Sequence, residues 1–161
     1  MKLGIVIGRF QPVHIGHITL IKQAIKQSQH VLIFLGSSFE PSTVKNPFSV
    51  QQIADALRGT KKTLLIKNPV NPDIKLWIGA VERLQNVGID DIGLIHRGFT
   101  AYGKTEYRNV PMWQIPIEMK RLFPKLSMIC DPSHICGNRT GLLSVAQKSV
   151  DLDYDGLTSI L

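Results

Sequence analysis

Cysteine is scarce in this chain of 161 residues, which has only Cys130 and Cys136, six positions apart. One pair excludes a framework of several disulfide bridges, and no second pair is present to complete a zinc site. We therefore interpret both as free thiols, which is typical of a protein from a reducing compartment.

Long apolar runs are also lacking. The first run, residues 3–7, follows a single lysine and is soon interrupted by Arg9, so it is too short for a signal peptide. No stretch approaches the roughly 20 apolar residues that a membrane-spanning helix needs. We therefore expect a cytoplasmic protein that makes no contact with a membrane. Internal repeats and low-complexity segments are absent as well.

Acidic residues are outnumbered, with 12 Asp and Glu against 19 Lys and Arg, which gives a formal net charge of +7. Such a balance favours anionic ligands such as phosphates, although solubility alone would also explain it. We expect no specific nucleic-acid partner. The length, with 43% hydrophobic and 19% charged residues, is that of one well-cored soluble domain.

Apolar runs alternate with helical patterns along the whole chain. The runs predict six strands, at residues 3–7, 30–35, 63–66, 92–95, 126–130 and 156–161. The periodic segments predict five helices, at residues 15–27, 49–58, 73–87, 112–123 and 141–152. Strict alternation indicates parallel strands with right-handed crossovers. We expect a single α/β domain over residues 1–161 with a Rossmann-like, doubly wound sheet, or alternatively a reduced or incomplete (βα) barrel.

Ligand sites in such folds lie at the carboxyl ends of the strands. The polar side chains expected there are those of Arg9, His14, His17, Lys67, His96, Arg97 and His134.

The opening stretch, KLGIVIGRFQPVHIGH, combines a strand, a turn and a helix start. Gly8 and Gly16 allow a ligand to approach the backbone closely. His14 and His17 are three residues apart at a helix N-terminus, so they share one face and lie where an anion is favoured. This pattern suits the binding of phosphate oxygens.

The segment GRFQPVHIGH resembles the signature of nucleotidylyltransferases, and of nicotinamide-mononucleotide adenylyltransferases in particular, over residues 1–48. The resemblance implies that His14 and His17 stabilise charge on the ATP phosphates during adenylyl transfer. It also implies that Gly8, Arg9 and Phe10 line the nucleotide pocket. The serine- and threonine-rich turn and the arginine that hold the triphosphate in that family do not occur after residue 48.

Residues 49–157 resemble the second half of DAHP synthase, a (βα)8 barrel enzyme, through LLIKNPVNPD, IHRGF, YRNVPMWQIPIEMK and ICDPSHICGNR. The resemblance implies that Lys67 and Arg97 bind a phosphate group and that His134 is a ligand of a divalent metal. The other metal ligands of that family are missing, and one ligand does not make a metal site.

The two resemblances meet at residues 46–49, and each is incomplete. The sequence therefore predicts an engineered chimera, with segments 1–48 and 49–161, that has no complete active site and only residual nucleotide or phosphate binding. The first alternative is an adenylyltransferase-like enzyme that binds ATP through His14 and His17, and the second is a phosphate-binding module without turnover. We expect no required cofactor, with ATP and magnesium as candidate ligands and a homodimer as a candidate assembly.

Overall fold

A computed structural model describes residues 3–8, 15–28, 30–35, 55, 57–59 and 63–158, with the backbone alone for 3–8, 17 and 30–35. The chain divides into two compact units, residues 1–66 with 79–92, and residues 67–78 with 93–161. In the described part of the chain, no helix is both long enough and apolar enough to cross a membrane.

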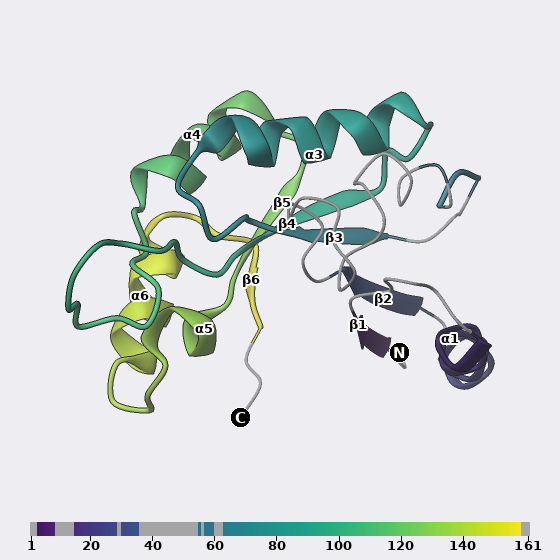
Figure 1. Ribbon diagram of the computed structural model, residues 1–161, viewed down its shortest axis with the longest axis horizontal. Helices are drawn as coiled ribbons and strands as arrows, with labels where there is room; N and C mark the ends of the chain where they lie inside the picture. The colour runs from purple at the N-terminus through teal and green to yellow at the C-terminus, as the bar shows by residue number, and fades with distance from the viewer. Residues whose placement is uncertain are drawn as a thin grey trace. The chain divides into compact units, whose positions relative to one another are not determined.

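The first unit contains a strand–helix–strand arrangement followed by a third strand. Its elements are β1 (Leu3–Gly8), α1 (Ile15–Gln27), β2 (His30–Leu35) and β3 (Leu64–Lys67). The three strands are parallel and lie in the order β1-β2-β3, with Leu3 opposite His30 and Ile33 opposite Leu64. Figure 1 shows α1 beside β1 and β2.

The described core of the first unit lies around β3 and the second half of α3 (Ile74–Asn86), the helix that begins in the other unit. Its buried apolar side chains are those of Leu64, Leu65, Ala80, Val81, Leu84, Val87, Ile89 and Ile92. Asp91 fixes the start of β3, because its carbonyl accepts from the N–H of Leu64 at 2.9 Å and its carboxylate from the hydroxyl of Thr63 at 2.6 Å. Gly88, with φ at +80°, ends the turn that follows α3.

The second unit continues the alternation. Its elements are β4 (Ile92–His96), α4 (Gln114–Leu122), β5 (Ser127–Cys130), α5 (Pro132–Cys136), α6 (Leu142–Asp151) and β6 (Gly156–Leu157). The strands are parallel in the order β4-β5-β6, with Gly93 opposite Ser127 and Ile129 opposite Gly156. Helices α5 and α6 lie side by side (Figure 1).

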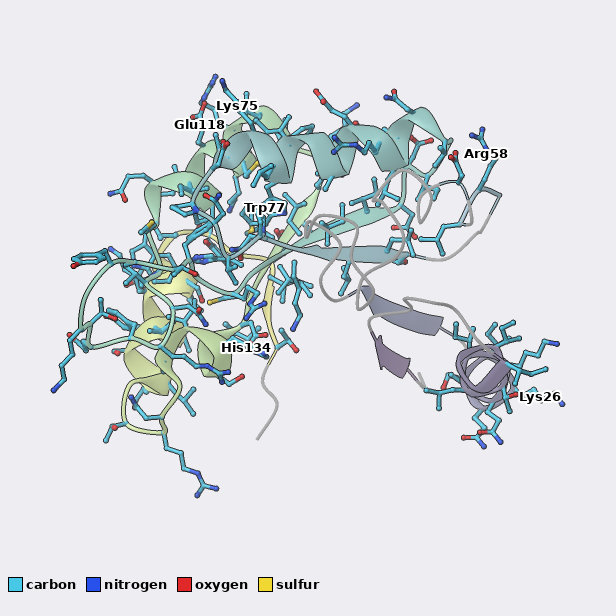
Figure 2. The ribbon with its side chains drawn as sticks, viewed as in Figure 1. Lys26, Arg58, Lys75, Trp77, Glu118 and His134 are labelled. Carbon is cyan, nitrogen blue, oxygen red and sulfur yellow. The ribbon has the colours of Figure 1, made fainter. Side chains whose placement is uncertain are left out.

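Aromatic and sulfur-containing side chains form much of the core of the second unit. Trp77 is fully buried on α3, on the side that faces the strands (Figure 2), and its ring meets that of Phe99 edge-on at 6.5 Å. Trp113 packs against the cluster formed by α5, α6 and the end of β5. Both tryptophans are therefore packing residues. Cys130 and Cys136 are buried free thiols, as the sequence analysis expects.

The α/β class with parallel strands and flanking helices is confirmed, but one element differs from prediction. Residues 132–136, where no helix was predicted, form the short helix α5. Asp131 caps this helix by accepting from the N–H of His134, and Pro132 occupies its first turn, where a missing N–H costs nothing. The helix expected over residues 49–58 lies almost entirely outside the described residues, as do residues 159–161 of the last strand.

Candidate functional sites

The first candidate site is the turn between β1 and α1. Gly8 is the last residue of β1 and Ile15 is the first of α1, so the strand and the helix expected on either side of the motif are present. Gly16 and His17 lie in the first turn of that helix. The other predicted nucleotide-binding residues lie outside the described part of the chain, namely Arg9, Phe10 and His14.

The N-terminus of α1 has the electrostatics that an anion requires. Its first turn has no acidic side chain, and Lys26 lies in the last turn, where Figure 2 shows it extending away from the helix. The first N–H groups of a helix have no partner within it and carry the positive end of its dipole. Phosphate oxygens are the ligands that such a terminus favours.

The second candidate site lies at the carboxyl ends of β3, β4 and β5, around Asp131. Lys67 ends β3, Arg97 follows β4 and Asp131 follows β5. The ammonium nitrogen of Lys67 lies 3.3 Å from Asp131 Oδ2, and Nδ1 of His134 lies 2.8 Å from the same oxygen. The structure therefore brings Lys67 and His134 to one carboxylate, which the sequence analysis did not single out.

Asp131 is held as a buried anion. Its side chain is 1% exposed, and Oδ1 accepts from the Ser133 hydroxyl at 2.9 Å and from the His134 N–H at 3.2 Å. Burial alone would raise the pKa of this carboxyl, but the contacts with His134, Lys67 and Ser133 outweigh burial and lower it to about 2. The cluster thus contains a permanent negative charge at neutral pH. Nδ1 of His134 lies close to Oδ2 of Asp131, but the two atoms do not have the geometry of a hydrogen bond.

Arg97 is positioned through its backbone. Its N–H donates to Oδ1 of Asn68 at 2.6 Å, while the amide nitrogen of Asn68 donates to the carbonyls of Pro69 and Gly98. Among the described residues, nothing accepts a hydrogen bond from the buried Nε of Arg97. Burial lowers the pKa of this guanidinium, the charge of Asp131 opposes that shift, and the charge of Arg108 adds to it. Arg97 is therefore a cation with donor capacity to spare.

His96 lies in the core rather than in the site. Successive residues of a strand point to opposite faces, so His96 and Arg97 diverge. The imidazole is fully buried, with Nε2 2.6 Å from the carbonyl oxygen of Pro111 and Nδ1 3.1 Å from the hydroxyl of Tyr154. The prediction that His96 is one of the polar side chains at the ligand-binding ends of the strands is therefore wrong.

His134 is the residue that the second resemblance assigns to a metal. It lies within α5 (Figure 2), and its nearest acidic group is Asp131. Among the described residues, no three His, Cys, Asp or Glu side chains come together as a metal centre. These residues do not fit a resident divalent cation, which would need several oxygen or nitrogen donors.

The described elements form an α/β protein in which the helix α1 follows the strand β1. The chain belongs to the cytidylyltransferase-like family, whose sequence model matches residues 5–126. The observed α/β fold is consistent with a Rossmann-like domain of that family.

Several archaeal nicotinamide-nucleotide adenylyltransferases are similar in sequence. The enzyme of Aeropyrum pernix is 37% identical over 93 residues, which cover 52% of this chain and 54% of that protein. The enzyme of Pyrococcus furiosus is 42% identical over 94 residues, covering 52% and 50%. That of Thermoplasma acidophilum is 31% identical over 121 residues, covering 69% and 66%. The chain therefore spans about half to two-thirds of the length of these relatives.

Two solved structures of 3-deoxy-D-arabino-heptulosonate 7-phosphate synthase from Thermotoga maritima are similar in fold. A truncated form superposes with a TM-score of 0.69 at 16% identity, covering 99% of this chain and 52% of that one. The second has a TM-score of 0.65 at 18% identity, covering 98% and 50%. Identities this low show a likeness of fold alone.

The prediction of a chimera without a complete active site is contradicted by these comparisons. One family model matches residues 5–126, a range that includes the joint expected at 46–49. The similar archaeal enzymes are named adenylyltransferases. The first alternative, an adenylyltransferase-like enzyme, is the interpretation that these findings favour.

Proposed function

We propose that the protein is a nucleotidyltransferase that takes ATP as its nucleotide donor and a phosphate monoester as its acceptor. The observation that carries this proposal is the family match over residues 5–126, which includes the whole GRFQPVHIGH segment. The strand β1 and the helix α1 support it, because the motif begins at the last residue of β1 and ends in the first turn of α1. The acceptor is proposed from the similar archaeal enzymes, which are nicotinamide-nucleotide adenylyltransferases.

The chemistry needs no covalent intermediate on the protein. An oxygen of the acceptor phosphate attacks the α-phosphorus of ATP, and the bond to the bridging oxygen breaks, so that pyrophosphate leaves with its electron pair. Magnesium arrives with ATP as part of the substrate. His14 and His17 would donate hydrogen bonds to the phosphate oxygens on which charge builds, together with the free N–H groups at the start of α1.

Replacing His17 or His14 with alanine is expected to lower turnover at least about 100-fold, the usual loss when a donor to a developing oxyanion is removed. The measurement is dinucleotide formed from ATP and nicotinamide mononucleotide, with pyrophosphate release followed in parallel. Lys26→Ala is the matched control, because Lys26 lies at the opposite end of the same helix and is exposed. Equal rates in wild type and both histidine variants, or no nucleotidyl transfer by the wild type, would contradict the proposal.

A second candidate function is the binding of a phosphate group by Lys67 and Arg97. The observation that favours it is the buried Nε of Arg97, which has no hydrogen-bond partner among the described residues. A buried donor without a partner costs about 1–3 kcal/mol, so a ligand oxygen at this position would be stabilising. The guanidinium fork also matches the geometry of a phosphate.

Arg97→Gln is expected to weaken the binding of inorganic phosphate at least about tenfold, because charge-assisted hydrogen bonds to phosphate are among the stronger ones. Isothermal titration calorimetry gives the dissociation constants. Arg121→Gln serves as the control, since Arg121 is exposed and paired with Glu118 on α4 at 2.7 Å. An unchanged affinity in Arg97→Gln would eliminate this second function while leaving the first intact.

A further inference from the structure

We infer that Asn68 is a positioning residue of the phosphate site proposed at Lys67 and Arg97, and that it acts by holding the backbone of Arg97 in place. The inference rests on the second candidate function proposed above. Asn68 is an uncharged residue that directly follows Lys67, and its place in the sequence alone gave it no role. Its side-chain contacts reach the segment that begins at Arg97.

The side-chain amide of Asn68 is enclosed and uses both of its polar ends. The residue is 2% exposed. Its Oδ1 accepts from the N–H of Arg97 at 2.6 Å, and its Nδ2 donates to the carbonyls of Pro69 at 2.7 Å and Gly98 at 2.8 Å. Because a backbone N–H only donates and a carbonyl only accepts, these partners leave the amide a single orientation.

The side chain of Asn68 takes the place of a main-chain carbonyl in the pairing of β3 with β4. The N–H of Leu64 donates to the carbonyl of Asp91 at 2.9 Å. The N–H of Asn68 donates to the carbonyl of Ile95, also at 2.9 Å and with the same offset along the chain. At this register, a regular parallel ladder would continue from the N–H of Arg97 to the main-chain carbonyl of Asn68. The N–H of Arg97 donates to the side chain instead, so the pairing beyond the strand ends depends on this amide.

The backbone around Arg97 is fastened on two sides. One amide, that of Asn68, binds the N–H of Arg97 and the carbonyl of the following Gly98. On the other side of β4, the N–H of Asp131 donates to the carbonyl of His96 at 2.8 Å. The stem of the Arg97 side chain therefore starts from a point that Asn68 fixes toward β3 and Asp131 fixes toward β5.

Removing the amide would move that starting point. In Asn68→Ala, the N–H of Arg97 would pair with the main-chain carbonyl of residue 68, as in a regular ladder, or with water. Either change rotates the peptide group that precedes the Arg97 side chain. Recognition of a phosphate by a guanidinium depends on its direction, and a binding group has to be held to within about 0.5 Å. The loss of Asn68 should therefore weaken phosphate binding through Arg97.

Lys67 is held by a separate contact. Its Nζ lies 3.3 Å from Oδ2 of Asp131, an ion pair that involves no atom of the Asn68 side chain. An effect of Asn68 that passes through Arg97 should consequently disappear once Arg97 is replaced, whereas a general loosening of the site would remain. This difference separates positioning from a purely structural role.

The test is a double-mutant cycle of wild type, Asn68→Ala, Arg97→Gln and the double variant. Titration with inorganic phosphate is followed by the NMR signals of the backbone amides, which report weak as well as tight binding. We expect Asn68→Ala to weaken phosphate binding at least about tenfold, as the loss of an outer-shell partner commonly does. In the Arg97→Gln background, the same substitution should change the dissociation constant less than about twofold.

Thr63→Val is the matched control. The Thr63 hydroxyl donates to the Asp91 carboxylate at 2.6 Å, at the other end of β3, so this variant loses a hydrogen bond remote from Arg97. We expect its phosphate affinity to equal that of the wild type. Thermal melting of each variant accompanies the titrations, and Asn68→Ser supplies a second cycle if Asn68→Ala does not fold.

Three results would count against the proposal in different ways. An unchanged phosphate affinity in Asn68→Ala, with a lowered melting temperature, assigns Asn68 a purely structural role and overturns the inference. Equal losses from Asn68→Ala with and without Arg97 show that Asn68 does not act through Arg97, which overturns it as well. The absence of phosphate binding by the wild type contradicts the second candidate function itself.

Discussion

Gly98→Ala is expected to lower the free energy of unfolding by about 3–5 kcal/mol, the sum of a left-handed backbone and a steric clash. Gly98 has φ at +77°, and an added Cβ would lie 2.5 Å from the carbonyl oxygen of Asn109 and 2.9 Å from its Cβ. The clash is with backbone, which cannot move without opening the bridge between Phe99 and Val110. The carbonyl of Gly98 also accepts from the buried amide of Asn68, so a shift of the turn breaks that hydrogen bond.

Gly103→Ala is the matched control for this substitution. Gly103 has φ at +86° in the same loop, but a Cβ there would meet nothing within 4 Å. We expect it to lose about 1 kcal/mol from backbone conformation alone. Chemical denaturation of both variants therefore isolates the clash as the difference between them. Equal losses in the two variants would show that the turn after Arg97 is not tightly packed against Asn109.

The alternation of strands and helices was predictable because the apolar patterns are local. Buried parallel strands appear as continuous apolar runs, and glycine ends helices at the expected place, as at Gly88. The convergence of Lys67 and His134 was also predictable, since residues that follow parallel strands meet at one edge of a sheet. The contact between Lys67 and Asp131 joins residues 64 positions apart, yet predicting it requires only the strand assignments.

Two features of the second site were not predictable from local pattern. Helix α5 has five residues, too few for a periodic signal, although aspartate followed by proline is a recognisable helix start. His96 and Arg97 are adjacent polar residues at one strand end, and only the three-dimensional packing of Trp113 and Tyr154 shows which of the two is buried. Charge and hydropathy do not separate a core histidine from a ligand-facing one.

The functional prediction failed for a different reason. It weighted motifs that are missing, such as the arginine that holds the triphosphate in nucleotidylyltransferases, above the motif that is present. A missing motif is weak evidence, because hydrogen-bond donors to a phosphate can come from backbone N–H groups or from other positions in the chain. The family match over residues 5–126, which spans the expected joint at 46–49, outweighs that absence.

The stability of the protein is expected to fall by about 3 kcal/mol as the pH drops from about 6.5 to about 4, because of His96. Its pKa in the folded protein is lowered from 6.5 to about 4, chiefly by burial, with the Pro111 carbonyl and the charge of Asp131 opposing that shift. The carbonyl of Pro111 can only accept, so Nε2 carries the proton of the neutral ring and Nδ1 accepts from the Tyr154 hydroxyl.

The sign of this effect follows from which state binds the proton. Below pH 6.5 the unfolded chain protonates His96 while the folded protein does not, so acid favours unfolding until the folded form also titrates near pH 4. Asp131 acts in a separate window, because its folded pKa of about 2 lies below its usual 3.8 and its contribution is lost only as the pH falls through that lower range. The contributions of His96 and Asp131 to the free energy of unfolding can therefore be measured separately, in different pH ranges.

Urea denaturation at a series of pH values tests the prediction, with His96→Gln as the comparison. Glutamine can still donate to the Pro111 carbonyl but does not titrate. The His96→Gln variant should therefore have a lower free energy of unfolding at pH 7. That free energy should also lack the pH dependence of up to about 1.4 kcal/mol per pH unit that His96 adds. Tyr154→Phe removes the donor to Nδ1. Because that hydrogen bond favours the neutral ring, its loss should raise the pKa of His96 and narrow the window of pH dependence. Identical slopes in the wild type and His96→Gln between pH 6.5 and 4 would mean that the imidazole is hydrated rather than enclosed by Phe99, Trp113 and Tyr154.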